Sequence, residues 1–336
     1  MSLVLAFPPL PPPGPVPPDR PDDDHDAQHY EGHDEDPEDD GEGRGEHALT
    51  LRRAVAVVAG DPTERSRFVT WREHTPLMTA ATIAPSDDLV VALRGAASPR
   101  PSVDRGLAGG LRAWLDDGIF ELAGVPAAGQ LRVATRDVVG APPRGERAGL
   151  LRGALVAQLL RLHVAGCTPE DPFGAASTAL LSSGRDDDLA ATLVELDGDE
   201  RARLAAEVAS HAVVLVERLP AIPARWSPRV GVSHRVPLAG GGAVLCGRVD
   251  LSLGAPGGAT ACVCLLDVTT SPLEARHLGG LTYLALLTTL RSGEAPLRVA
   301  ALSTADGAAL VLDVDATMLT DAVEAVLRAI AAMVAR

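Results

Sequence analysis

The sequence contains no lysine and no asparagine, because all 30 of its basic residues are arginine. Without lysine the chain cannot form a Schiff base, cannot seat a phosphate in a GxxxxGK[ST] loop and has no catalytic ammonium group. Any protein class whose mechanism needs a lysine is therefore excluded, or is present only in a form that has lost it. Aromatic residues make up only 3% of the chain, so a folded core must be built mainly from aliphatic side chains.

Long apolar runs and cysteine pairs are also missing. No apolar run reaches the roughly 18 residues that a membrane-spanning helix needs. The apolar start MSLVLAF has no basic residue before it and runs into prolines, so we expect no signal peptide. The four cysteines form no CxxC pair, which predicts reduced thiols. We therefore expect a cytoplasmic protein that does not associate with a membrane.

Acidic charge is concentrated at the start of the chain. Residues 1–50 hold 14 of the 45 acidic residues but two of the 30 arginines, so they carry −12 of the net charge of −15 and the rest carries −3. Because residues 51–336 are nearly neutral, we expect no strong non-specific affinity for nucleic acid. Their charge still permits a local arginine-lined groove. Residues 1–48 are rich in proline and then in acidic residues, which predicts a disordered tail.

Beyond the tail, the patterns divide the chain into two regions. The first, 49–145, is expected to be an α/β region of unknown role. Its segments 51–60, 87–95 and 131–139 resemble strands, and 103–122 resembles a helix.

The second region, 146–336, has clearer signals. Helices are predicted over 147–165, after a capping box that begins at Asp197, after a second box over 271–274, and after Asp315. Gly-rich turns join three strand-like runs into antiparallel hairpins, and two more strands follow; the runs are 229–238, 243–254, 260–270, 297–304 and 309–315. The order predicts an α/β core, with a mixed sheet flanked by helices.

Two aspartates in this core are candidates for chemistry. Asp250 closes GRVD in the second strand, and Asp267 lies in LLDVTT in the third, two residues before Thr269 on the same side of the strand. If the hairpin register places the two aspartates opposite each other, their carboxylates converge and can hold Mg²⁺ or Mn²⁺. The alternative is that each aspartate only solvates a strand end or bonds a turn.

These residues, in this order, resemble the PD-(D/E)XK nuclease superfamily, and in particular its RecB-type branch. In that branch one strand ends in GxxD, the next carries DxK followed by Ser or Thr, and the following helix carries QxxxY. An upstream helix contributes the His of an RGxxxH motif. The resemblance covers roughly residues 145–315. It implies a PD-(D/E)XK-like core and a metal-dependent DNA nuclease fold, in which the His and two acids bind Mg²⁺ or Mn²⁺.

The match of the motifs is partial. Gly247, Arg248 and Asp250 fit the first acidic motif, Asp267 fits the second acid, and the helix after them carries Tyr283 at the Tyr position. The resemblance therefore implies Asp250 and Asp267 as metal ligands.

Three polar positions of the family are lost. Thr269 stands at the Lys position, Gly279 at the Gln position, and Ala157 at the His position, in a helix whose start fits through Arg152. In the family the Lys positions the attacking water or stabilises charge at the scissile phosphate. Losing one such electrostatic stabiliser commonly costs about 10²–10³ in rate, and Mg²⁺ tolerates the loss of one ligand because it keeps several waters.

Other polar residues are weaker candidates. By the resemblance, the catalytic set consists of the two aspartates together with Thr269 and Tyr283, and the possible DNA contacts are Arg152, Arg248 and Arg276. Glu207 or Glu217 could add a third carboxylate, although a solvent-facing role is favoured for both, and His163 is interpreted as an ordinary helix-end residue. Some family members hold an iron–sulfur cluster with three C-terminal cysteines, but no cysteine follows Cys264, so we expect none here.

Three functions remain open from the sequence. The first is a catalytically impaired or inactive nuclease-like protein that binds DNA or a partner, such as a helicase or another DNA-processing protein, in DNA processing, repair or defence. The second is an active Mg²⁺- or Mn²⁺-dependent DNA nuclease with a remodelled site. The third is a structural protein that shares the fold and binds no nucleic acid.

Overall fold

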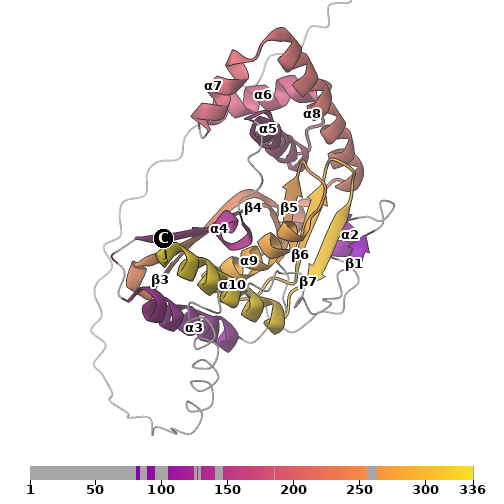
Figure 1. The fold of residues 1–336 in the computed structure, drawn as a ribbon. Helices are drawn as coiled ribbons and strands as arrows, with labels where there is room; N and C mark the ends of the chain where they lie inside the picture. The colour runs from indigo at the N-terminus through magenta and orange to yellow at the C-terminus, as the bar shows by residue number, and fades with distance from the viewer. Residues whose placement is uncertain are drawn as a thin grey trace, which may run out of the picture. The chain divides into compact units, whose positions relative to one another are not determined.

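A computed structural model describes residues 81–83, 89–94, 105–124, 127, 130–140, 147–184, 186–255 and 263–335 (Figure 1). Within them, the strands are β1 (Ala81–Ile83), β2 (Leu131–Ala134), β3 (Arg229–Leu238), β4 (Ala243–Leu253), β5 (Cys264–Thr269), β6 (Arg298–Ser303) and β7 (Ala309–Asp313). The helices are α2 (Leu89–Arg94), α3 (Arg105–Ala123), α4 (Thr135–Val139), α5 (Arg147–Val164), α6 (Pro172–Ser183), α7 (Asp187–Glu195), α8 (Gly198–Arg218), α9 (Ala275–Ser292) and α10 (Ala316–Val334).

All of these strands belong to one mixed sheet. Its order is β1-β7-β6-β5-β4-β2, and β3 also pairs with β4. The pairs β2–β4 and β5–β6 are parallel, and the other pairs are antiparallel. β5 and β6 can be parallel because α9 crosses between them, as parallel strands require. The predicted α/β architecture, with a mixed sheet flanked by helices, is therefore confirmed.

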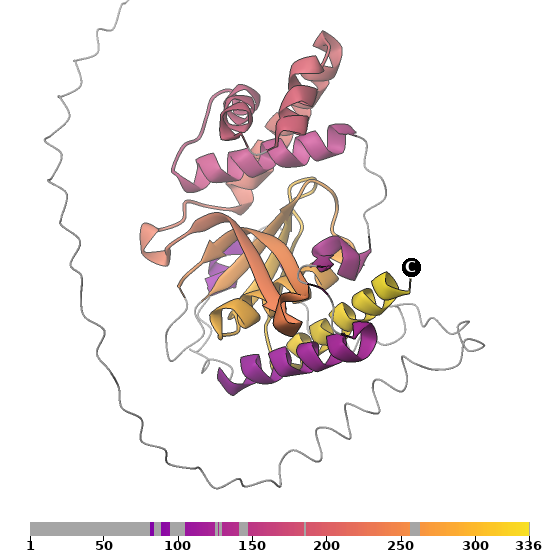
Figure 2. The same ribbon diagram turned by 90° about the vertical axis from the view of Figure 1, so that its left-hand side faces the viewer.

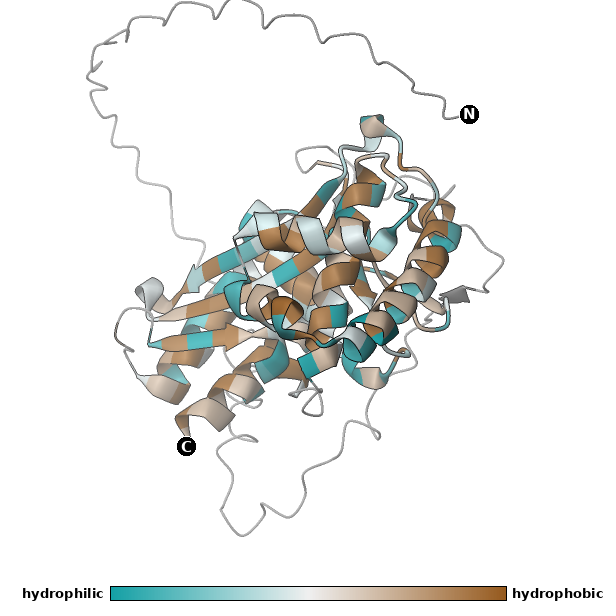
Figure 3. Ribbon diagram, turned by 90° about the horizontal axis from the view of Figure 1, so that it is seen from above, coloured by the Kyte–Doolittle hydropathy of each residue, from teal (hydrophilic) through white to brown (hydrophobic). Residues whose placement is uncertain are grey.

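The sheet separates two apolar layers. Along β5, Leu265 packs in the layer of α3, α9 and α10, while its neighbours Cys264 and Leu266 pack in the layer of α2 and α5–α8. This alternation is what a strand covered on both faces requires. Figure 2 shows α5–α8 on one side of the sheet with α3 and α10 on the other, and Figure 3 shows hydrophobic and hydrophilic residues alternating around the helices.

Local capping signals set several helix ends as the sequence predicts. The Asp197 carboxylate accepts a hydrogen bond from the Glu200 amide (2.8 Å) at the start of α8. Asp315 accepts one from the Met318 amide (2.8 Å) at the start of α10. Gly293 ends α9 in the left-handed conformation, with φ of 75°, which glycine adopts without a steric penalty.

Two segments that the sequence predicts as strands are partly helical. Residues 89–94 of the segment 87–95 form α2, whose last carbonyls find tertiary donors: the Arg298 guanidinium bonds Ala92 O and the Cys264 thiol bonds Leu93 O. The segment 131–139 is a strand only as far as Ala134 and then turns into α4.

The second capping box is also shifted. α9 begins after Glu274, not at Pro272, and the ring Nδ1 of His277 accepts a hydrogen bond from the Glu274 amide (2.8 Å). Glu274 has the extended backbone of a helix cap. The sequence SPLE therefore forms the approach to the helix and not its first turn.

The predicted disordered tail, 1–48, and the predicted strand over 51–60 lie outside the described residues. The region 49–145 contributes β1 and β2 to the same sheet as the strands of 146–336. Among the residues that the structure describes, no helix has the length and apolar character needed to span a membrane.

Two glycines of α3 test how closely this helix packs on α10. A Cβ atom at Gly118 would lie 2.6 Å from Cδ2 of Leu327, whereas Gly110 has nothing within 4 Å. We expect Gly110→Ala to raise the free energy of unfolding by about 1 kcal/mol, because alanine favours a helix. We expect Gly118→Ala to lower it, because overpacking costs about 1–3 kcal/mol. Urea titration measures both, and equal stabilisation would contradict this packing.

Candidate functional site

The register of β4 and β5 brings the two candidate aspartates together. Leu251 is paired with Leu266, and the same register extended by one residue places Asp250 opposite Asp267. The two carboxyl groups lie close enough for each to shift the pKa of the other. The sequence predicts convergence of the two carboxylates only if the hairpin register pairs the aspartates, and the structure has this register.

The Asp250 side chain also forms a hydrogen bond to β5 just beyond the last backbone pair of β4 and β5. Its Oδ2 accepts a hydrogen bond from the backbone amide of Val268 (2.9 Å). This bond fixes the carboxyl group against the end of β5. Asp250 therefore bonds the backbone of the neighbouring strand β5, as the alternative interpretation of the sequence proposed. Its carboxyl group also lies beside that of Asp267.

A glycine completes the row across the sheet. β3 pairs with β4 on both sides of Gly231, and this register places Gly231 opposite Asp250. Opposite residues of neighbouring strands point to the same face. Gly231, Asp250 and Asp267, from β3, β4 and β5, therefore form one row, which we call the acid row.

Burial and mutual repulsion set the ionisation of the two acids. Burial raises the pKa of Asp250, against the opposing effects of the Val268 amide, Asp267 and the guanidinium groups of Arg248 and Arg161. Burial also raises the pKa of Asp267 well above its ordinary value, and the negative charge of Asp250 raises it further. As the pH falls, Asp267 is therefore the first of the two to bind a proton, which it can donate to Asp250.

Two arginines lie beside the acid row. A Cβ atom at Gly231 would stand 2.9 Å from Nη2 of Arg248, on β4, and 3.1 Å from Nη2 of Arg161, on α5. Arg161 Nη1 also donates to Oε1 of the buried Gln158 (2.9 Å). We call Arg161 and Arg248 the arginine pair. Because glycine has no side chain, both guanidinium groups can approach the β3 backbone closely.

The residue at the predicted Lys position is engaged in a turn. The Thr269 hydroxyl is hydrogen-bonded to the Ser271 hydroxyl (3.0 Å) and accepts from the Ser271 amide (3.2 Å). The Thr269 carbonyl accepts from the amide and hydroxyl of Thr304 (2.8 and 3.0 Å). Thr269 therefore ties the end of β5 to the end of β6, and no cation stands at this position.

The upstream helix approaches the acid row through residues other than the expected one. Ala157, at the His position, is partly buried, and its neighbour Gln158 supports Arg161. Arg152 forms an ion pair with Glu207 of α8 (2.7 Å), so these two candidates connect α5 to α8. The imidazole of His163 contacts the carbonyl of Leu219, which agrees with a helix-end role.

The helix motif residues lie in the core. The Tyr283 side chain is fully buried, and its hydroxyl donates to the carbonyls of Val133 (2.9 Å) and Cys246 (3.1 Å), which links β2 to β4. Burial raises the pKa of the Tyr283 hydroxyl. Gly279 lets α9 approach α4, since a Cβ atom there would lie 2.9 Å from Cγ1 of Val139. Tyr283 and Gly279 thus serve packing at these contacts.

Of three further residues, two are engaged with other partners and one is exposed. Arg276 forms an ion pair with Glu274 (2.7 Å) at the start of α9. Glu217 is exposed on α8. Cys264 donates to the carbonyl of Leu93, and Cys262 lies outside the described residues.

The acid row fits a divalent cation in its type of donor. Asp250 and Asp267 are hard oxygen ligands, and both keep part of their surface open to solvent, which Mg²⁺ or Mn²⁺ with retained water ligands requires. Among the described residues, no group of three His, Cys, Asp or Glu side chains could hold a metal ion. Asp250 and Asp267 are therefore the two described side chains that could bind a metal here, and because a ligand carboxyl group must be ionised, the raised pKa of Asp267 weakens metal binding as the pH falls.

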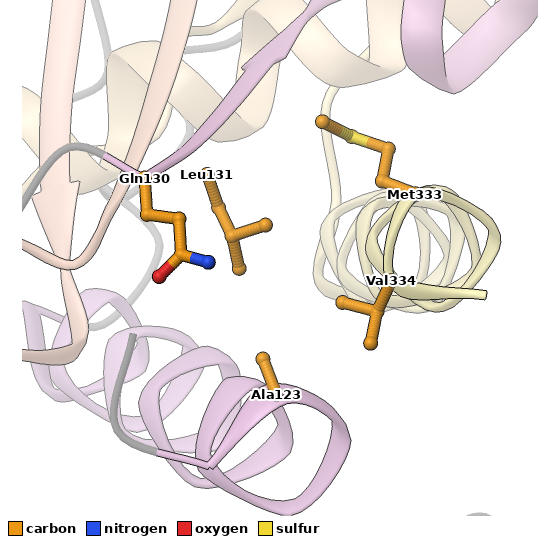
Figure 4. Close-up of a pocket in the computed structure, with 5 residues that line it drawn as sticks. All are labelled: Ala123, Gln130, Leu131, Met333 and Val334. Atoms are coloured by element: carbon orange, nitrogen blue, oxygen red, sulfur yellow. The ribbon is translucent and has the colours of Figure 1, made fainter. Parts of the chain in front are cut away.

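A separate pocket of about 360 Å³ opens between α3, β2 and the end of α10 (Figure 4). It shares no residue with the acid row. Four of its five lining residues have apolar side chains, and the Gln130 side-chain oxygen accepts a hydrogen bond from the Ala127 amide (2.9 Å). The lining residues are Ala123, Gln130, Leu131, Met333 and Val334.

Sequence reasoning missed Arg161, Gln158 and Gly231. One signal was available: an isolated glycine inside the predicted strand 229–238 indicates a close approach to the backbone. One of the two side chains that approach it, Arg161, however, comes from α5, 70 residues earlier in the chain.

No protein-family model matches the chain, and no curated protein matches its sequence. Among solved structures, one similar chain is described as "Crystal structure of SSO0001". The TM-score is 0.25 and the identity 11%, and the alignment covers 64% of this chain and 84% of that one. A similarity of this size carries no argument, so functional inference rests on the geometry of the site.

The coupling of the two acids predicts a pH effect on stability. Because folding raises the pKa of Asp267, wild-type protein gains stability from this group below about pH 4 and loses it as the pH rises through the raised pKa. Asp267→Asn keeps a side chain of similar shape but cannot titrate. We expect its free energy of unfolding, relative to wild type, to increase with pH by at most about 1.4 kcal/mol per unit.

Urea unfolding between pH 4.5 and 8 measures this difference. Burial lowers the pKa values of three histidines in both proteins, and these contributions cancel in the comparison; the residues are His211, His234 and His277. A difference that does not change with pH would contradict the raised pKa of Asp267, which burial and then the charge of Asp250 cause.

Proposed function

We propose that the protein is a PD-(D/E)XK-like, RecB-type nuclease-fold protein that acts in DNA processing, repair or defence by binding DNA, and that it has lost efficient cleavage. The observation that carries the proposal is the convergence of Asp250 and Asp267 across the β4–β5 register. Both acids stand on the strands where the motif order predicts them. A parallel strand, β6, follows the intervening helix α9.

The lost positions support impaired catalysis. The chain has no lysine, and Thr269, at the Lys position, uses its hydroxyl to bond Ser271. Ala157 offers no ligand at the His position. An arginine can stabilise charge but cannot lose a proton, so it cannot act as a base toward water.

The acid row keeps what binding of a divalent cation needs. Asp250 and Asp267 are the residues that would hold Mg²⁺ or Mn²⁺. When bound, such an ion would neutralise charge on a phosphate oxygen. The Val268 amide orients the Asp250 carboxyl group.

The proposed setting is the cytoplasm, where thiols stay reduced. Three described cysteines are free, and two of them are buried. A helicase or another DNA-processing protein is the proposed partner class, because a module that binds DNA without cutting it acts by positioning other enzymes.

A cleavage assay separates impaired from active enzyme. Full-length protein is incubated with linear and plasmid DNA in Mg²⁺ or Mn²⁺, beside Asp250→Ala. We expect wild type and variant to release the same background of product, because the site lacks both the Lys and the His. Cleavage by wild type that disappears in Asp250→Ala would show that the protein is an active nuclease with a remodelled site.

A gain-of-function variant tests whether the loss of the Lys and the His explains the impaired catalysis. Thr269→Lys combined with Ala157→His returns the cation and the third ligand, so we expect Asp250-dependent cleavage about 10² above wild type. Adding Asp250→Ala to this variant is the control and should abolish the gain. If the restored protein stays at background while it still folds, the lost residues are not the reason for inactivity.

A further inference from the structure

The helix α8 has apolar side chains on two opposite faces. The inner face packs on α5 and α6 through buried residues that include Leu204, Val208 and Leu215. On the opposite face, four exposed residues and the partly buried Ala209 form a second apolar row, which we call the α8 stripe: Ala202, Ala206, Ala209, Val213 and Val216. The outer face of a surface helix is ordinarily polar, so the α8 stripe is an apolar surface that lacks a partner element.

The spacing of the α8 stripe suits contact with another helix. Its successive residues are 4, 3, 4 and 3 positions apart, which is the spacing of a coiled-coil seam. Val213 is 56% exposed and Val216 is 42% exposed, and together they present the largest apolar side chains of the stripe. α8 lies along one edge of the layer of α5–α8, so a second helix can approach it from solvent (Figure 1).

The charges beside the α8 stripe indicate which helix fits. Arg203, Ser210 and Glu217 follow one flank of the stripe at intervals of seven residues, and all three are exposed. Among the described residues, neither Arg203 nor Glu217 forms an ion pair. If a second α8 lies antiparallel to the first, with a two-fold axis at Ser210, each Arg203 stands opposite Glu217 of the other copy. A parallel pair would instead place this flank against the uncharged flank of Ala205 and Ala212.

We propose that a second copy of this chain binds the α8 stripe through its own α8, in an antiparallel contact about a two-fold axis at Ser210. The same surface then serves both copies, so the assembly closes at two chains. The antiparallel orientation also places the N-terminus of each helix beside the C-terminus of the other, where their dipoles attract. The α8 stripe shares no residue with the acid row, so this inference does not depend on the proposed function.

The length of the α8 stripe limits the strength of the dimer. From Ala202 to Val216, α8 is about 21 Å long. One pair of helices over this length buries less than the roughly 800 Å² per partner of a standard interface. We therefore expect a reversible dimer with a Kd of about 10–100 µM. The acidic residues 1–50 of the two chains repel each other, and salt at about 0.15 M screens this repulsion.

Sedimentation velocity of the full chain, over concentrations from about tenfold below to about tenfold above this Kd, measures the association. We expect the weight-average mass to rise from that of one chain towards that of two, because the two-fold contact closes the assembly. A mass that stays at one chain over this range would overturn the proposal. A mass that continues to rise beyond two chains would overturn the two-fold contact.

Two valine variants with the same change of charge locate the interface. Val213→Glu places a carboxylate in the middle of the α8 stripe, so we expect it to raise the Kd at least about tenfold. Val194→Glu, on α7, is the matched control, because Val194 is 65% exposed and lies outside the stripe. Urea titration confirms that both variants fold. Equal dimerisation of the two variants would overturn α8 as the contact surface.

A charge exchange tests the antiparallel arrangement. Arg203→Glu and Glu217→Arg each place like charges opposite each other twice in the dimer, so we expect each to raise the Kd about tenfold. They change the net charge in opposite directions, so a general effect of charge cannot weaken both. The double variant Arg203→Glu/Glu217→Arg restores two opposite-charge pairs and should dimerise as wild type does. Single variants with the wild-type Kd, or a double variant that is weaker than either single variant, would overturn the antiparallel contact.

Discussion

The hydrogen bond from the Val268 amide to Asp250 Oδ2 is the contact on which the site depends. It forms one residue beyond the last backbone pair of β4 and β5, where a strand end would otherwise leave its amide to water. The bond turns the Asp250 carboxyl group toward β5, so that it meets Asp267. The effect that each acid has on the pKa of the other follows from this placement.

Around this contact, the residues at the predicted motif positions pack against neighbouring elements or bond to them. Gly279 lets α9 approach Val139 of α4, and the Tyr283 hydroxyl links two strands through their carbonyls. Thr269 closes a turn with Ser271. At these positions the side chains therefore make contacts within the scaffold.

Local signals predicted much of the fold, and tertiary contacts account for the rest. The strand 229–238 has the predicted bounds, and Asp197 and Asp315 cap their helices, because these signals act within a few residues. Residues 89–94 form a helix whose end is bonded by Arg298, 204 positions or more away, which no local pattern reveals.

The candidate site divides in the same way. The convergence of the two aspartates was conditional on a hairpin register that the sequence suggested. The arginine pair was not foreseen, because it requires α5 to cross β3 at a glycine.

The most direct measurement is a crystal structure of the full chain with a short single-stranded DNA oligonucleotide. DNA bound against the pair of Asp250 and Asp267 is the predicted result. DNA bound on a face away from this pair would contradict it.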